Sequence, residues 1–267
     1  MNVFAFELRR QLRSLLTDSV VMAVLVTGLL AACFPVYRDA KADVEQILAG
    51  YPPQFLATFG LTDKNGIFSF AGFFRFSYLY LALAAAIMAS AWGLSVFGRE
   101  SRSRCDDFLL AMPASRWRVF AGKLGACLAC VAVLTAVTVA SCLWSQAYAG
   151  ADEVEAGRVA LAALELTGVE LVALAAGALL GSCLRRVRSV SGLATGIGLA
   201  GWILYILPDL LDEKKLRWLS PFSWFDPERV FNKGAFTGKY LVAAAVVVLV
   251  LLAAAAVRSI LREARAA

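Results

Sequence analysis

Six long apolar segments constrain this chain more than any other feature of its sequence. A helix rises about 1.5 Å per residue, so roughly 20 apolar residues cross a hydrocarbon core about 30 Å thick. Lipid offers no partner to free backbone polar groups, so segments of this kind are predicted to be membrane-spanning helices. The segments are Val20–Val36, Phe70–Phe97, Val119–Tyr148, Val159–Leu184, Val190–Pro208 and Tyr240–Val257.

The composition agrees with an all-α membrane protein. Hydrophobic residues make up 60% of the chain, whereas soluble domains have about 45–50%. No boundary or repeat divides the sequence, so residues 1–267 are predicted to form a single transmembrane domain. Residues 209–239 form a long outer loop, which contains an aromatic motif around Ser220-Pro221-Phe222.

Residues 1–17 are predicted to form an amphipathic helix before the first span. Apolar residues recur there at helical spacing, at Phe4, Leu8, Leu12 and Leu15, and three arginines occupy the other side. This pattern favours a helix that lies in the membrane interface.

The distribution of charge predicts the orientation of the spans. One side, which includes both termini and the segments Gly98–Lys123 and Arg185–Arg188, carries 15 Lys/Arg and 6 Asp/Glu. The other side carries 11 Lys/Arg and 12 Asp/Glu. Because the more basic side faces the cytoplasm, both termini are predicted to be cytoplasmic. The formal net charge of +6 therefore reports topology and gives no support to nucleic-acid binding.

The loop at residues 98–118 is the most informative polar segment. Residues Asp106–Met112 have the pattern of a short amphipathic helix, and Pro113 ends it because proline lacks the backbone N–H. A short, charged and partly apolar helix on the cytoplasmic side is suited to docking on a soluble partner.

Several classes of enzyme are excluded by the absence of histidine. Ser-His and Cys-His catalysis and most zinc sites need that residue. Cys127 and Cys130 form a CxxC pattern inside an apolar span, where the structural interpretation is helix packing. A phosphate-binding loop is also absent, since Gly122-Lys123-Leu124 lacks the first glycine and the hydroxyl residue. No catalytic or metal-binding residue is therefore expected.

Glu165 and Glu170 are acids within the fourth apolar segment. A charge at that depth is costly and should face the protein interior or a water-filled path. Two interpretations are open: each glutamate is protonated or hydrogen-bonded and holds helices together, or it lines a translocation path. In the same segment, Gly177 and Gly181 favour close packing, predicted here to be against the glycine-rich span that follows.

The segment from Glu100 to Lys123 resembles the first cytoplasmic loop of type-2 ATP-binding-cassette (ABC) exporter permeases. That loop has a glutamate, then Gly-Thr-x-Glu, a Leu-Leu pair, a proline, Ser-Arg, and a Gly-Lys that opens the next span. This sequence departs from it at Arg104-Cys105, where the family has Gly-Thr. The six spans, the N-terminal amphipathic helix and the Ser-Pro-Phe motif are also similar. The matching positions are Glu100, Asp107, Leu109-Leu110, Pro113, Ser115-Arg116 and Gly122-Lys123.

This resemblance implies the membrane subunit of a bacterial exporter in the cytoplasmic (inner) membrane. It implies a dimer with a second copy or a related permease chain, and separate ATPase subunits that bind ATP and Mg²⁺. The chain itself is expected to hold no cofactor. Residues Asp106–Met112 would be the coupling helix, seated in a cleft of the ATPase. The implied partner-binding residues are Arg99, Glu100, Arg102, Asp106, Asp107, Leu109, Leu110, Pro113 and Arg116.

Two alternatives belong to other classes of protein. An intramembrane enzyme would depend on acids or a Ser-Lys pair, and Glu165 and Glu170 lie about 140° apart around a helix, which is a poor alignment for joint catalysis. A membrane scaffold or channel would need no ATPase partner. An associated ATPase subunit would distinguish the exporter from both.

Overall fold

The computed structural model describes residues 3–41, 46–47, 50–51, 68–99, 116–151, 153–184, 187–211, 218 and 220–266. The described part of the chain is helical and contains no β-strand. Its helical segments are α1 (Val3–Thr27), the π-helical η1 (Gly28–Cys33), α2 (Phe34–Asp39), α5 (Phe70–Phe97), α8 (Arg116–Tyr148), α9 (Ala156–Cys183), α10 (Val190–Leu210), α11 (Pro221–Trp224), α12 (Pro227–Lys233) and α13 (Gly238–Ala266).

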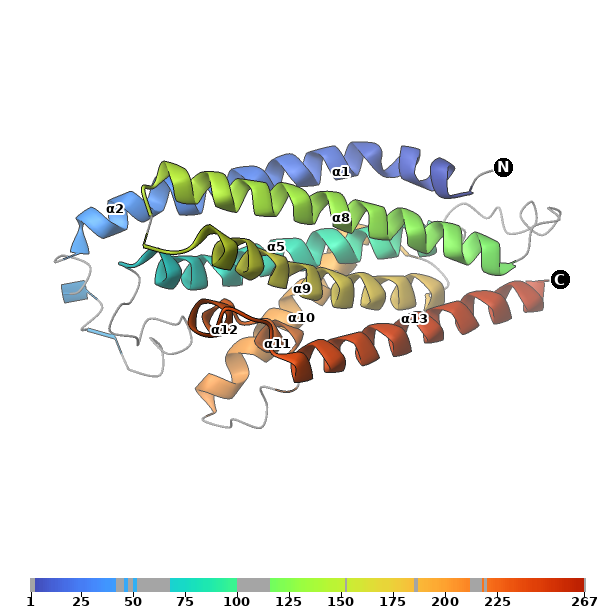
Figure 1. Cartoon of the computed structure of the whole chain (residues 1–267). Helices are drawn as coiled ribbons and strands as arrows, with labels where there is room; N and C mark the ends of the chain where they lie inside the picture. Colours follow the sequence, from blue (N-terminus) through green and yellow to red (C-terminus); the bar gives the residue numbers. More distant parts are fainter. Residues whose placement is uncertain are drawn as a thin grey trace.

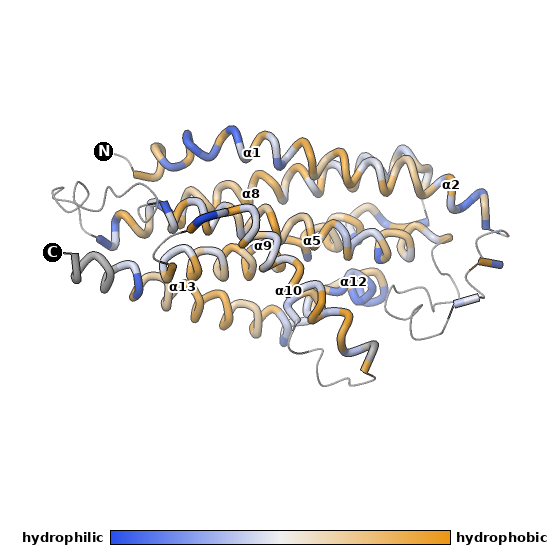
Figure 2. The backbone as a smooth tube through the Cα atoms, turned by 180° about the vertical axis from the view of Figure 1, so that it is seen from behind, coloured by the Kyte–Doolittle hydropathy of each residue, from blue (hydrophilic) through white to orange (hydrophobic). Residues whose placement is uncertain are grey.

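Six helices in the described residues are long and apolar enough to cross a membrane, which confirms the predicted number. They cover Val3–Asp39, Phe70–Phe97, Arg116–Tyr148, Ala156–Cys183, Val190–Pro208 and Gly238–Ser259. The second span has the predicted bounds. Hydrophobic residues fill most of the helices, whereas hydrophilic residues follow the apolar first turn of α1 and make up much of α12 (Figure 2).

The long helices run side by side, and both ends of the chain lie at the same end of the bundle (Figure 1). We call this the terminal end, and the opposite one the distal end. α1 and α8 start together at the terminal end, because a Cβ on Gly122 would lie 3.0 Å from Val3 Cβ. α5 runs the other way and finishes there, with Arg99 beside Glu7. α11 and α12 lie near the distal end.

The N-terminal segment is helical, as predicted, and its position in the membrane interface stays a prediction. α1 is uninterrupted from Val3 to Thr27 and passes through η1 and α2 to Asp39. No glycine or proline falls within α1 to break it. Its beginning packs along α8, where Phe4 lies against Gly125, so it follows the bundle and continues directly into the first span.

The π-helical turn η1 accommodates a proline without ending the helix. Pro35 lies in the first turn of α2 and has no N–H to donate. Just before it, the N–H of Phe34 donates to the carbonyl of Leu29, five residues earlier. This wider turn lets the helical path continue across the proline.

The tightest helix contact in the core joins α5 to α9. A Cβ on Gly93 would lie 2.6 Å from the carbonyl oxygen of Leu174, and one on Gly177 would lie 2.4 Å from that of Ser90. A Cβ on Gly181 would lie 3.0 Å from the backbone N of Gly98, at the end of α5. The glycines of α9 therefore pack against α5. Their predicted packing against the following span is wrong.

Candidate functional site

The loop predicted to dock on a partner lies between two described residues at the terminal end, Arg99 and Arg116. Arg116 opens α8 and has an exposed side chain. The loop itself falls outside the described residues, and so do the predicted site residues Glu100, Arg102, Asp106, Asp107, Leu109, Leu110 and Pro113. The coupling helix therefore stays a prediction from the sequence.

Aromatic and glycine contacts fix the two helix ends from which that loop departs. The rings of Phe97, at the end of α5, and Phe120, in the first turns of α8, have centroids 5.2 Å apart. Trp117 meets the same Phe120 ring edge-on at 6.2 Å. A Cβ on Gly98 would lie 2.9 Å from Val187. The end of α5 is thus held against both α8 and the segment that follows α9.

Arg99 forms an ion pair with Glu7 of the same chain. The Arg99 side chain is 18% exposed and that of Glu7 is 7% exposed. Arg99 therefore has an internal partner at the point where the loop begins, in addition to the partner-binding role that the resemblance implies. No periodic signal marks Glu7 in the sequence, because it stands among the arginines of an amphipathic pattern.

Glu165 and Glu170 both lie inside the bundle, with 4% and 0% of their surfaces exposed. Thr135 of α8 donates a hydrogen bond to Oε2 of Glu170 at 3.3 Å, and its hydroxyl lies 3.0 Å from that of Thr167. Oε2 of Glu165 and Oε1 of Glu170 are buried without a hydrogen-bond partner among the described residues. Glu170 thus connects α9 to α8, the arrangement expected of a glutamate that holds helices together.

A substitution at Glu170 separates the packing role from a role in transport. We expect Glu170→Gln to keep the fold, because an amide oxygen can still accept from Thr135 and carries no charge to bury. Glu170→Ala should destabilise the chain by about 1–3 kcal/mol, since it leaves a void and a hydroxyl without its acceptor. Thermal unfolding in detergent measures both variants, with the exposed Glu153→Gln as the matched control. A Glu170→Gln chain that folds normally and no longer transports would contradict a purely structural role.

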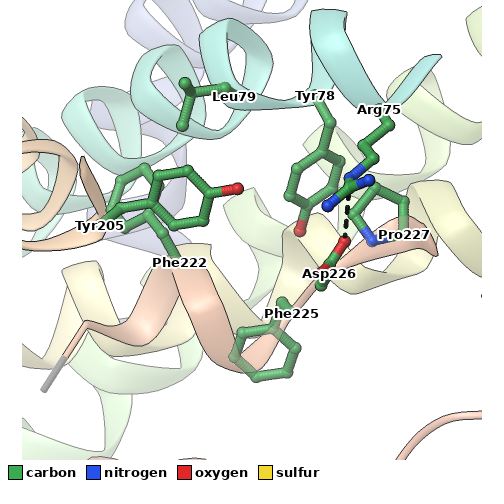
Figure 3. A pocket seen from close by; sticks show the side chains of 8 residues that line it. All are labelled: Arg75, Tyr78, Leu79, Tyr205, Phe222, Phe225, Asp226 and Pro227. Carbon is green, nitrogen blue, oxygen red and sulfur yellow. Dashed lines mark ion pairs between the residues drawn. The ribbon is translucent and has the colours of Figure 1, made fainter. Parts of the chain in front are cut away.

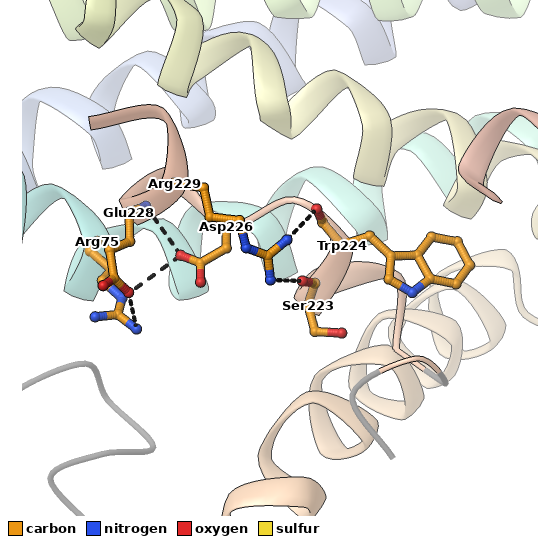
Figure 4. Close-up of polar contacts among 6 residues, drawn as sticks. All are labelled: Arg75, Ser223, Trp224, Asp226, Glu228 and Arg229. Carbon is orange, nitrogen blue, oxygen red and sulfur yellow. Dashed lines mark hydrogen bonds and ion pairs between the residues drawn. The ribbon is translucent and has the colours of Figure 1, made fainter. Parts of the chain in front are cut away.

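A cluster of charges that the sequence analysis did not identify lies at the distal end. Arg75, in the first turns of α5, places Nη2 2.7 Å from Oε2 of Glu228 and Nε 3.8 Å from Oδ1 of Asp226 (Figure 4). Asp226 also caps α12, because its Oδ1 accepts from the N–H of Glu228 at 3.1 Å. One feature of the sequence could have indicated this cluster: Arg75 is a single arginine near the edge of an apolar span. Charged residues at such positions in membrane proteins usually have a partner of opposite charge.

The Ser-Pro-Phe motif begins the short helix α11 and anchors it to the spans. The buried Ser220 hydroxyl donates to the carbonyl of Gly201 at 3.0 Å, and Phe222 packs on the same glycine. Phe225 lies so close to Gly168 of α9 that a Cβ there would be 2.1 Å from its ring. These close approaches explain two of the glycines that the sequence places within spans.

The cap formed by α11 and α12 leaves a cavity of about 10 Å³ against α5, about the space of one water molecule. Arg75, Tyr78 and Asp226 lie around this space, with Tyr205 on its other side (Figure 3). The remaining lining residues are Leu79, Phe222, Phe225 and Pro227. A cavity of this size holds no transported molecule, so the cap closes this part of the distal end in the conformation described.

Arg229 holds the cap together, and its replacement tests that arrangement. It donates to the carbonyls of Ser223 at 3.1 Å and Trp224 at 3.3 Å (Figure 4), and its guanidinium lies 4.4 Å from the centre of the Tyr240 ring. We expect Arg229→Met to destabilise the chain by about 2–4 kcal/mol, because two hydrogen bonds and a cation–π contact are lost together.

The measurement is the thermal midpoint of the purified protein in detergent. Lys233→Met, at an exposed position on the same short helix, is the control for removal of a positive charge. Equal midpoints for the two variants would show that Arg229 does not hold the cap.

The comparisons with known proteins agree with this architecture. The sequence model of a protein family described as "ABC-2 family transporter protein" matches residues 1–262. No curated protein matches the chain. The match extends over nearly the whole sequence and includes all six membrane helices. The chain therefore belongs to the ABC-2 family of transporter membrane proteins.

Proposed function

We propose that this chain is the permease subunit of an ATP-driven exporter that moves a substrate out of the cytoplasm. The observation that carries the proposal is the family match over residues 1–262. The six spans take up most of the described residues, which supports placing nucleotide chemistry on other subunits. ATP and Mg²⁺ belong in this proposal to separate ATPase subunits, and the chain acts as a dimer with a second copy or a related permease.

The terminal end of the bundle is the cytoplasmic end in this proposal, in the inner membrane of a bacterium. The excess of basic residues in the segments at that end supports it. The loop at residues 98–118 then faces the ATPase, and Leu109 and Leu110 are its apolar anchor. The contact between Phe97 and Phe120 supports this role, because it joins the two helices that would receive movement of the loop.

Transport follows as a shift between two conformations. ATP binding brings the two ATPase subunits together, which moves the coupling loops and favours the outward-facing arrangement of the spans. The packed cap at α11 and α12 supports a conformation in which this part of the chain is closed against α5. Glu165 and Glu170 are candidates for the path, and the contact of Glu170 with Thr135 would then be one that rearranges during transport.

The experiment that tests the proposal is affinity purification of the tagged chain from detergent-solubilised membranes of its native host. We expect an ATPase subunit to co-purify and the eluate to hydrolyse ATP. An unrelated multi-span protein with the same tag is the control for detergent aggregation. A chain that purifies without any ATPase would favour a membrane scaffold or channel instead.

A further inference from the structure

Polar contacts connect α1 to α5 along a single stripe, and three of them define it, beside a weaker bond from the Trp92 indole to Ser14 at 3.3 Å. Glu7 pairs with Arg99, the Gln11 amide donates to the Ser95 hydroxyl at 2.8 Å, and the Trp92 indole donates to Asp18 at 2.9 Å. The residues on α1 are four and seven positions apart, and those on α5 are four and three apart in the reverse direction. This spacing keeps each set on one side of its helix. We call the three contacts the polar ladder.

The polar ladder lies between the two helices, with three of its members buried and the other three, Asp18, Ser95 and Arg99, half-buried. Glu7 is 5% exposed, Gln11 4% and Trp92 1%. Removal of one member of such a pair leaves a buried polar group or charge without its partner, so the contacts favour a single register of α1 on α5. The arginines of α1 lie elsewhere: Arg9, Arg10 and Arg13 are exposed. The polar side chains of this segment that contact α5 are instead those of Glu7, Gln11, Ser14 and Asp18.

The ladder ends where the loop at residues 98–118 begins. Arg99 is the last described residue before that loop, so its pairing attaches the start of the loop to Glu7 of α1. From Glu7 the helical path continues without a break into the first span and reaches Asp39 near the distal end. A displacement of the start of the loop is therefore passed to two spans, α5 through the chain and α1 through the ladder.

We propose that the polar ladder makes α1 and α5 one mechanical unit through which the loop moves the first span. Glu7 and Arg99 are positioning residues in this mechanism: they hold the start of the loop against α1. This inference rests on the proposed function, because the movement of the loop comes from the ATPase. It adds the first span as a second receiver of that movement, and it assigns the N-terminal part of α1 to force transmission.

The experiment uses three versions of the full-length chain beside the wild type: Glu7→Gln, the single charge reversal Glu7→Arg, and the double reversal Glu7→Arg with Arg99→Glu. Arg10→Gln, at an exposed position on the same helix, is the control. The first measurement needs no ATPase. Hydrogen exchange of residues 3–18 in nanodiscs should accelerate in Glu7→Arg and return toward the wild-type rate in the double reversal.

The second measurement is the amount of substrate moved per ATP hydrolysed by the complex in proteoliposomes. The ratio should fall by about 2- to 30-fold in Glu7→Arg, the range expected for changes along a coupling route. It should recover in the double reversal and stay unchanged in Arg10→Gln. ATPase capture should be equal in the wild type, Glu7→Gln, Glu7→Arg and Arg10→Gln, because none of these versions changes a residue of the loop. For the double reversal the ratio is normalised to the ATPase captured, because Arg99 is also among the implied partner-binding residues.

The outcomes separate the two proposals. The ladder mechanism is overturned if hydrogen exchange is equal in Glu7→Arg and the wild type. It is also overturned if ATPase is captured and the coupling ratio is the same in Glu7→Arg as in the wild type. Either result leaves the exporter proposal intact. A wild-type chain that captures no ATPase overturns the exporter proposal and, with it, the coupling role of the ladder. If hydrogen exchange in Glu7→Arg is still accelerated in that case, the role of the ladder is only to hold α1 on α5. Recovery of both measurements in the double reversal supports the mechanism.

Discussion

Leu110→Asp is expected to abolish capture of the ATPase subunit and ATP-driven transport, whereas Arg102→Ala should leave most of both. The prediction follows from the resemblance of residues 100–123 to a coupling loop, in which Leu110 is an anchor seated in the partner. Burial of a leucine contributes about 1.5–3 kcal/mol, and an aspartate there would add the cost of placing a charge in an apolar cleft. An exposed ion pair, the role implied for Arg102, contributes about 0–1 kcal/mol.

The measurement is the amount of ATPase that co-purifies with each variant from membranes, normalised to the amount of permease. Leu110→Met is the matched control, because it keeps an apolar side chain of similar volume. Equal losses for Leu110→Asp and Arg102→Ala would contradict the ranking and would place the anchor elsewhere in the loop. Normal capture by Leu110→Asp would remove the coupling helix from residues 106–112.

Gly177→Leu is expected to prevent stable folding of the chain. At this position even a Cβ would lie 2.4 Å from the carbonyl oxygen of Ser90, and the nearest atoms belong to the backbone, which cannot rotate away. Overpacking of a core usually costs about 1–3 kcal/mol. A backbone clash also separates α5 from α9 along their length and breaks the contact around Gly93, so the effect here should exceed that range.

Monodispersity and thermal midpoint after size-exclusion chromatography in detergent measure this effect. Gly196→Leu is the matched control: it is also a glycine inside a spanning helix, but nothing lies within 4 Å of a Cβ there. We expect the control to fold and the Gly177 variant to aggregate or degrade. If both variants behaved like the wild type, α5 and α9 would have to be farther apart than the structure places them.

Much of the architecture follows from local properties of the sequence. Phe70–Phe97 is a spanning helix with the bounds that its apolar run predicts, because burial in lipid requires both a minimum length and internal hydrogen bonding of the backbone. The same reasoning gave the number of spans. The position of both termini at one end also follows, since an even number of crossings returns the chain to its starting side.

The sequence was incomplete where a pattern had two physical explanations. The beginning of α1 is amphipathic, which suits a helix in the membrane interface, yet the same pattern fits a helix that packs on α8 and presents polar residues to α5. The burial of Glu7 depends on Arg99, which is 92 residues away. Periodicity within one segment contains no information about such a distant partner.

For the candidate site, too, the sequence identified some residues, and the fold decided which partners they contact. The sequence identified Glu165 and Glu170 from the cost of an acid within an apolar span, but only the folded structure brings Thr135 of α8 to Glu170. Arg75 stands near the edge of an apolar span in the sequence. Its pairing with Asp226 and Glu228 depends on how the outer segment folds back over α5.

The sequence by itself therefore determined the number of spans, the helical class and the likeness to ABC-2 permeases, because each depends on the local run of residues. The tertiary structure decided which helix faces meet: the glycines of α9 against α5, and the acids of α1 against Arg99 and Trp92. The physical reason is that lipid selects apolar segments one at a time. The choice of neighbours depends on small residues and paired polar groups on helices far apart in the chain.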